Sequence, residues 1–167
     1  IIKVRDLYKI FKIGDNKVYA LNGVSFDVYK GEFVAIVGTS GSGKSTCLNM
    51  LAGLEAPSRG AIQIVGKRID KMSESDLVTF RRENVGFIFQ SYNLIASMNA
   101  VENVAMPLMF RGVPYETSIK VAEKFMKLIG IGDQAEHMPN QMSGGQQQRV
   151  GIARALVIDP KIIFADE

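Results

Sequence analysis

Residues 38–46 read GTSGSGKST, and they directly follow the apolar run FVAIV at residues 33–37. The spacing is that of G-x-x-x-x-G-K-[ST], a loop that leaves a strand and enters a helix. The pattern predicts a strand over the apolar run, a helix beginning near Lys44, and an α/β fold. A flexible turn rich in glycine and serine is the alternative. The match at every defined position of the motif makes that alternative the weaker interpretation.

Each residue type in this loop suits a phosphate group. Glycines let backbone N–H groups turn toward a β-phosphate, Lys44 brings an ammonium to the β and γ oxygens, and Ser45 offers a hydroxyl to Mg²⁺. The predicted helix directs the positive end of its dipole at the same phosphates. Lys44 is therefore expected to act in catalysis as well as in binding. The expected nucleotide contacts are Gly38, Thr39, Ser40, Gly41, Ser42, Gly43, Lys44, Ser45 and Thr46.

The composition is that of one globular domain. The chain has 167 residues, of which 47% are hydrophobic and 22% charged, enough for one core and too few for two ordinary domains. Its net charge of +3 is mild and scattered, so we expect no nucleic acid partner. Cys47 is the only cysteine; we interpret it as a small buried hydrophobe in a protein of a reducing compartment. No apolar stretch reaches membrane-spanning length, and the start does not resemble a signal peptide.

Periodic patterns divide the chain, a single predicted domain over residues 1–167, into three regions. Residues 1–90 alternate short β-branched or aromatic runs with turn signals and include the phosphate loop, which predicts a β subdomain joined to an α/β core. Residues 91–141 carry two apolar stripes of helical period and are expected to form a helical subdomain. Residues 142–167 are expected to form one helix and one strand.

Three local signals sharpen this outline. Asn22 and Gly23 predict a turn between two short strands. Ser73, with Asp76 three residues later, predicts the N-cap of a helix. Pro107 lies inside the first helical stripe of residues 91–141, so we expect it to kink or split that helix.

A second glycine-containing helix start lies at Ser143, where the sequence reads SGGQQQR. A serine hydroxyl, exposed backbone amides and a helix dipole make this start suitable for an anion. A serine-capped helix with a glutamine-rich solvated face explains the same residues. Spacing alone leaves these two interpretations about even.

The last six residues, IIFADE, place two carboxylates directly after an apolar run. The run predicts a buried parallel strand, and ligands of α/β sheets bind at the carboxyl ends of such strands. Asp166 is suited to hold Mg²⁺ through water, and Glu167 to polarise an attacking water. Two solvated acids at a strand end are the alternative, and the phosphate loop earlier in the chain makes that alternative the weaker one.

Together these motifs resemble those of the ATP-binding cassette (ABC) ATPases. GTSGSGKST is similar to the family's Walker A motif, SGGQQQR to its signature motif, and IIFADE to its Walker B motif. Gln90, after the run GFIF, resembles the Q-loop glutamine. The resemblance covers essentially the whole chain and is strongest to the lipoprotein-release, macrolide-efflux and cell-division branch. It implies a P-loop NTPase core with an N-terminal antiparallel β subdomain and a helical insert.

The resemblance also implies a mechanism. Two cassettes would face each other head to tail with two ATP molecules between them, as a homodimer that drives a transmembrane permease subunit from the cytoplasmic face of the membrane. Glu167 and Gln90 would act on the lytic water, and Mg²⁺ would be held by Ser45, Gln90 and Asp166. Phe11 would stack on adenine, with Tyr19 as the competing aromatic. The partner's γ-phosphate would be capped by Ser143, Gly144, Gly145 and Gln146.

The chain departs from the family at its end. The family continues after Walker B with a D-loop, a further strand and a switch histidine, whereas this sequence stops at Glu167 and its only histidine is His137. We therefore expect a C-terminally incomplete cassette that has an open edge on its Walker B strand and hydrolyses ATP negligibly by itself.

Other functions stay open at this point. A regulatory ATPase of a membrane complex of the cell-division type would turn over slowly and carry the same motifs. A soluble ABC ATPase that works on nucleic acid or ribosomes usually carries a fused second cassette or a long coiled-coil insertion, and neither appears between Gln90 and Ser143. A P-loop kinase is the weakest alternative, because it has no use for the SGGQQQR helix start.

Overall fold

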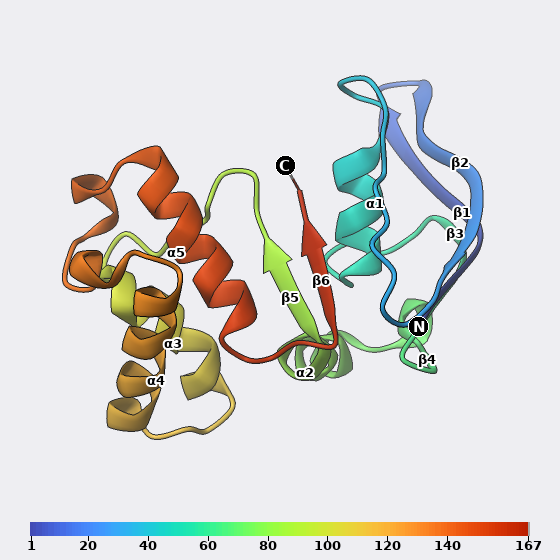
Figure 1. The fold of residues 1–167 in the computed structure, drawn as a ribbon. Helices are drawn as coiled ribbons and strands as arrows, with labels where there is room; N and C mark the ends of the chain where they lie inside the picture. The colour runs from blue at the N-terminus through green and yellow to red at the C-terminus, as the bar shows by residue number, and fades with distance from the viewer. Residues whose placement is uncertain (167) are drawn as a thin grey trace. The chain divides into compact units, whose positions relative to one another are not determined.

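The computed structural model describes residues 1–166, and it divides into two compact units, Ile1–Val78 and Thr79–Glu167. Each unit is described by itself. In Figure 1 the first unit runs from blue to green and the second from green to red.

A four-stranded antiparallel sheet forms most of the first unit, in the order β2-β1-β3-β4. Residues of alternating burial on its long strands form the core of the unit, because successive side chains of a strand point to opposite faces; Val4, Leu7, Ile62 and Ile64 are fully buried. This confirms the predicted antiparallel β subdomain. The strands are β1 (Ile2–Ile13), β2 (Asn16–Val28), β3 (Arg59–Ile64) and β4 (Lys67–Arg68), and a 3₁₀ turn, η1 (Ile69–Lys71), follows them.

The predicted turn at Asn22 and Gly23 is wrong, because β2 runs through both residues. The ladder pairs Tyr8 with Asn22 and Leu7 with Val24, which leaves Gly23 as an extra residue on its strand. Its φ of 74° marks a β-bulge, a feature that bends a strand without ending it. Turn and bulge use the same residue types, and only the partner strand distinguishes them.

The helix after the phosphate loop, α1 (Lys44–Leu51), begins where the sequence predicts it. It buries Cys47, Met50 and Leu51, and Gly53 follows its end with a φ of 67°.

The predicted strand at residues 33–37 does not form. These residues belong to neither sheet, and Phe33 and Val37 are 97% and 87% exposed. A strand requires a neighbour for its N–H and C=O groups, and no segment within residues 1–166 pairs with this one. The local sequence favours an extended backbone, but the strand itself depends on its neighbour.

The second unit contains a parallel pair of strands, β5 (Val85–Ile88) and β6 (Ile162–Ala165). The pairing confirms the predicted parallel strand before the carboxylates. Its burial is only partial: Ile162 and Phe164 are buried, whereas Ile163 is 48% exposed. Helix α2 (Glu74–Asn84) leads into β5, and its N-cap is Ser73, whose hydroxyl accepts from the Asp76 backbone N–H at 3.2 Å.

Three helices pack around an apolar core in the rest of the second unit (Figure 1). Val104, Met126 and Val150 are fully buried, one from each helix. Helix α3 contains Pro107 and continues past it, so of the two expected outcomes a split is wrong and a kink stays a prediction. Leu108, beyond the proline, packs against the same core. The helices are α3 (Ala100–Phe110), α4 (Tyr115–Leu128) and α5 (Gly144–Leu156), with 3₁₀ turns η2 (Gly132–Gln134) and η3 (Pro139–Gln141) before α5.

Candidate functional site

The phosphate loop leads into α1 through a glycine that no other residue can replace. Gly43 is the N-cap of α1 and has a φ of 91°, in the region that L-residues avoid. A Cβ on Gly43 would lie 2.2 Å from the carbonyl oxygen of Ala20. No side chain caps this helix start, so its backbone N–H groups are the ones that an anion can meet.

The Lys44 ammonium folds back over the loop. Its Nζ donates to the carbonyl oxygens of Gly38 at 3.0 Å and Thr39 at 3.1 Å, and the backbone N–H of Ser42 also donates to the Thr39 carbonyl at 3.2 Å. These bonds close the segment into a compact loop with the cation directly above it. Ser45, on the first turn of α1, is exposed.

Cys47 is inert in this structure. The side chain is buried on the inner face of α1, and burial raises the pKa of its thiol to about 11. The thiolate is the reactive form, so Cys47 packs as a hydrophobe, as the sequence predicts.

The two candidate aromatics for adenine lie on paired strands. Phe11 on β1 is 40% exposed and Tyr19 on β2 is 53% exposed, so both rings are accessible for stacking. The Lys9 ammonium lies 5.3 Å from the centroid of the Phe11 ring. It is held by Glu55 at 2.9 Å and by the carbonyl of Ala56 at 2.8 Å. Phe11 as the adenine contact stays a prediction.

Gln90 and Asp166 lie at the same edge of the parallel strand pair. The register pairs Ile88 with Ala165, and the backbone N–H of Asp166 continues the ladder by donating to the Ile88 carbonyl at 3.0 Å. Because the strands are parallel, the residues that follow them leave the sheet at one edge. Gln90 is exposed there and Asp166 is half-buried. Glu167, the expected base, lies outside the described residues.

The start of α5 is a complete capping box. The Ser143 hydroxyl accepts from the Gln146 backbone N–H at 3.3 Å, and the Gln146 side-chain oxygen accepts from the Ser143 backbone N–H at 2.8 Å. The serine O–H can still donate, because its oxygen accepts in this bond. Gly144 and Gly145 are exposed beside it. The structure therefore confirms the serine-capped helix, and the anion-binding role stays a prediction.

Sequence reasoning missed the groups that hold the segment after Gln90. The guanidinium of Arg154, on α5, donates to the carbonyl oxygens of Tyr92 at 2.7 Å and Asn93 at 2.6 Å. The fully buried Asn103 fixes the next residues, because its amide donates to the carbonyl of Ile95 and accepts from the Ile95 N–H. The sequence did contain a signal for Arg154, because this cation stands between Ala153 and Ala155 in the otherwise apolar end of a predicted helix.

The structure assigns the predicted site residues to two units. The phosphate loop and Phe11 belong to Ile1–Val78, and Gln90, Ser143 and Asp166 belong to Thr79–Glu167. Within the second unit, Gln90 and Asp166 come together at one sheet edge. A site built from both units stays a prediction.

The available metal donors are few and are all oxygens. The described residues contain no group of three or more His, Cys, Asp or Glu side chains that could hold an ion. The predicted donors are the Ser45 hydroxyl, the Gln90 amide oxygen and the Asp166 carboxylate. Mg²⁺ prefers oxygen and usually keeps water and phosphate oxygens as further ligands, so this sparse set fits Mg²⁺ with a nucleotide.

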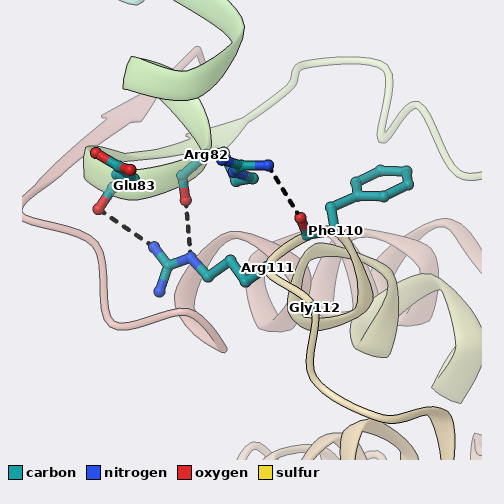
Figure 2. A pocket seen from close by; sticks show the side chains of 5 residues that line it. All are labelled: Arg82, Glu83, Phe110, Arg111 and Gly112. Atoms are coloured by element: carbon teal, nitrogen blue, oxygen red, sulfur yellow. Dashed lines mark hydrogen bonds between the residues drawn. The ribbon is translucent and has the colours of Figure 1, made fainter.

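A cavity of about 540 Å³ lies in the second unit (Figure 2). Arg111 donates to the carbonyls of Arg82 at 2.8 Å and Glu83 at 3.3 Å, and Arg82 donates to the Phe110 carbonyl at 3.3 Å. Gly112 completes the lining, and none of the predicted site residues that the structure describes takes part in it. The cavity lies between the last residues of α2 and of α3, and none of the sequence motifs contributes a described residue to it.

A family model described as ABC transporter matches residues 21–167 of the chain. The chain belongs to this family and is an ATP-binding domain of it. The sequence motifs had indicated this membership, and the match confirms it.

Relatives with assigned names support the same conclusion. An uncharacterized ABC transporter ATP-binding protein of Thermotoga maritima is 47% identical, over the whole chain and 71% of its own length. The lipoprotein-releasing system ATP-binding protein LolD of Chromohalobacter salexigens is 43% identical, over 99% of the chain and 70% of LolD. The macrolide export ATP-binding/permease protein MacB of Hyphomonas neptunium is 46% identical, and the whole chain matches 26% of it.

Solved structures confirm the fold. The ATP-binding cassette MJ0796, in a dimeric post-hydrolysis state bound to ADP and Pi, superposes with a TM-score of 0.96 at 42% identity. The match covers all of this chain and 74% of that one. The fold is therefore that of an ABC ATPase cassette, as the sequence predicts.

Proposed function

We propose that these residues form the motor subunit of an ABC transporter, which binds and hydrolyses ATP with Mg²⁺. One observation carries the proposal: α1 begins without a side-chain cap, directly after a loop whose Lys44 ammonium lies over its own carbonyls. Such a start combines backbone N–H groups that no side chain caps, a helix dipole and a cation, which together suit a nucleotide's β- and γ-phosphates. The family membership narrows the nucleotide to ATP.

Each site residue then has a role that its position allows. Lys44 neutralises charge on the terminal phosphates, and Phe11 stacks on the base. Bound Mg²⁺ would neutralise charge on the β- and γ-phosphate oxygens. Ser45, Gln90 and Asp166 supply oxygens that would hold the ion. Glu167 polarises the attacking water.

A head-to-tail homodimer explains the second helix start. MJ0796 is dimeric in its solved structure. In this chain Gly145 is exposed, and a Cβ placed on it would meet nothing within 4 Å. The packing of residues 1–166 therefore does not require glycine there, although glycine costs a helix about 1 kcal/mol relative to alanine. Close approach of the partner's nucleotide accounts for the glycine at position 145, and Ser143 donates to the γ-phosphate beside Gly144 and Gln146.

The expected partner in the membrane is a permease subunit. MacB is named as an ATP-binding and permease protein, and LolD as part of a lipoprotein-releasing system. Among residues 1–166, no helix has the length and apolar character needed to cross a bilayer. We propose that the cassette lies at the cytoplasmic face of the membrane and reaches it through this partner. The regulatory and soluble alternatives carry the same motifs. Copurification with a membrane subunit would separate a transporter from the soluble alternative, and an ATPase assay of that complex with candidate cargo would separate it from the slowly turning over regulatory one.

The decisive experiment removes the Lys44 ammonium in the intact protein. Lys44→Ala loses charge-assisted bonds to phosphate worth about 1.5–3 kcal/mol, so ATP affinity should fall roughly 10- to 100-fold. Equilibrium binding of a fluorescent ATP analogue measures the affinity. Lys67→Ala, on exposed β4, is the matched control and should bind normally. Unchanged affinity in Lys44→Ala would reject the proposed phosphate site.

That residues 1–167 alone hydrolyse ATP negligibly stays a prediction. It is measured as phosphate release by purified protein with and without the Lys44→Ala change. Release that depends on Lys44 would contradict the prediction.

A further inference from the structure

Arg154 is a buried cation without a carboxylate partner among the described residues. Only 9% of the residue is exposed, and it stands in the last turn of α5. None of the ion pairs within residues 1–166 includes it. Its guanidinium instead donates to two consecutive backbone carbonyls, those of Tyr92 and Asn93, at 2.7 and 2.6 Å. A buried charge is costly unless it is paired or fully bonded, so these two bonds hold it in place.

The backbone of Tyr92 and Asn93 is unusual in a way that serves these bonds. Their φ angles are 60° and 48°, in the left-handed region that L-residues enter at a cost. A left-handed turn aligns successive carbonyls, as any helical turn does, whereas an extended strand would point them in opposite directions. The two strained residues therefore present a pair of acceptors that one guanidinium fork can reach together.

Tyr92 also lies along the first two turns of α5. A Cβ on Gly144 would be 3.0 Å from the Tyr92 hydroxyl oxygen, and one on Gly151 would be 3.7 Å from the Tyr92 carbonyl oxygen. Residues seven apart share one face of a helix, so the tyrosine runs from the start of α5 to its middle. The contact at Gly144 is tighter than a side chain there would usually allow, whereas the distance at Gly151 is an ordinary van der Waals contact.

We infer that Arg154 is a positioning residue that locks the segment after Gln90 onto α5, so that Gln90 and the Ser143 helix start move as one rigid body. Gln90 stands two residues before Tyr92, and Gly144 stands one residue after Ser143. The lock thus joins the two motifs that flank residues 91–141. This inference rests on the proposed function, in which Gln90 and Ser143 act on different nucleotides.

The lock has a functional consequence that simple stabilisation of the fold would not have. When Ser143 closes on the partner's phosphate, the same displacement is transmitted to Gln90 at the other nucleotide. Loosening the lock should therefore misplace Gln90 during turnover while leaving the phosphate loop, and hence ATP affinity, intact. The signature is a loss of kcat without a change in ATP Kd.

The first test is Arg154→Lys in the intact protein. Lysine keeps the charge but cannot span two carbonyls with a planar fork. We expect kcat to fall roughly tenfold or more, as misplacement of a catalytic group does, with ATP Kd within about twofold of wild type. Hydrogen exchange measured by mass spectrometry should rise at residues 90–95. Arg59→Lys, an exposed arginine on β3, is the matched control and should change neither quantity.

The second test leaves Arg154 untouched. Asn93 is exposed, so Asn93→Gly and Asn93→Ala both remove the same amide without opening the core. Glycine accepts the left-handed conformation freely, whereas alanine does not. We expect kcat of Asn93→Ala to be about fivefold below that of Asn93→Gly, and exchange at residues 90–95 to be faster in the alanine variant. This pair remains informative if Arg154→Lys does not fold.

The outcomes separate this inference from the proposed function. Faster exchange at residues 90–95 together with lower kcat and normal ATP Kd supports the lock. Unchanged exchange in folded Arg154→Lys, or equal kcat and exchange in the two Asn93 variants, overturns it. If the wild-type protein shows no ATP turnover that depends on Lys44, the proposed function fails, while the exchange measurements still decide whether the lock exists.

Discussion

The two glycine-containing helix starts of this chain differ in how their first backbone N–H groups are capped. At α1 the N-cap is Gly43, with a left-handed backbone and no side-chain cap. At α5 the N-cap is Ser143, whose hydroxyl and Gln146 partner form a closed capping box. The first start has no side-chain cap for its backbone N–H groups, whereas the second caps part of its own.

The difference indicates the order in which the two starts act. A start without a cap gains most from an anion, so we propose α1 as the primary phosphate site. A capped start is already stable and adds a donor from Ser143 when a phosphate arrives. This matches a cassette that first binds ATP through its own loop and then offers α5 to the nucleotide of a second copy.

The largest expected effect lies outside both helix starts, at Glu167. Glu167→Gln removes a general base and keeps the size of the side chain, so kcat should fall by about 10²- to 10⁴-fold. Both helix starts remain intact, so the ATP-bound homodimer should accumulate. Phosphate release and size-exclusion chromatography with ATP measure the two effects. Hydrolysis at the wild-type rate would remove Glu167 from the mechanism and leave the comparison of the two starts untouched.

The second-largest effect is expected from a substitution at the start of α1. In Gly43→Ala the new methyl would meet the Ala20 carbonyl at a φ of 91°. Left-handed strain and the clash together should lower the free energy of unfolding by about 3 kcal/mol and abolish ATP binding. Gly14→Ala is the control, since its φ is 61° with nothing near the new methyl; it should cost only about 1 kcal/mol. Equal losses of stability in urea titrations of the two variants would contradict the steric argument.

Removing the N-cap of α5 should lower the free energy of unfolding by less than the change at Gly43. Ser143→Ala removes one capping bond and should lower the free energy of unfolding by about 1 kcal/mol. Ser73→Ala removes the equivalent bond from α2, where the hydroxyl accepts from Asp76 N–H, and is the matched control. Only the Ser143 variant should weaken the ATP-dependent homodimer, about tenfold, through the lost donor to phosphate. Sedimentation velocity with ATP distinguishes them, and equal dimerisation would argue against phosphate capping by Ser143.

The smallest expected change is an increase in stability. Gly145→Ala places a methyl in open space on α5, so the free energy of unfolding should rise by about 0.5–1 kcal/mol, the helix preference for alanine. Turnover should nevertheless fall, because the methyl occupies the space through which the partner's nucleotide approaches. Thermal melting and steady-state ATPase rates are measured on the same sample. A variant that is both more stable and fully active would show that no phosphate approaches Gly145.

Local patterns predicted much of this molecule. The start of α1, the capped start of α5 and the parallel pairing of β6 follow from spacing and periodicity within about ten residues, which is the range over which such patterns act. Gly23 and residues 33–37 were misread because their conformation depends on a partner strand. A bulge and a turn differ only in what lies opposite, and an extended apolar run becomes a strand only when another strand bonds to it.

The sequence by itself indicated the family of this protein and predicted its phosphate chemistry, because the spacing of glycine, lysine and serine in residues 38–46 is that of a phosphate-binding loop before a helix. The tertiary structure alone decided how the segment after Gln90 is held. Arg154 lies 61 residues from Asn93 in the chain, and no local pattern predicts which backbone carbonyls a buried guanidinium will find. Long-range contacts of this kind arise only once the core around α5 has packed and excluded water from the cation.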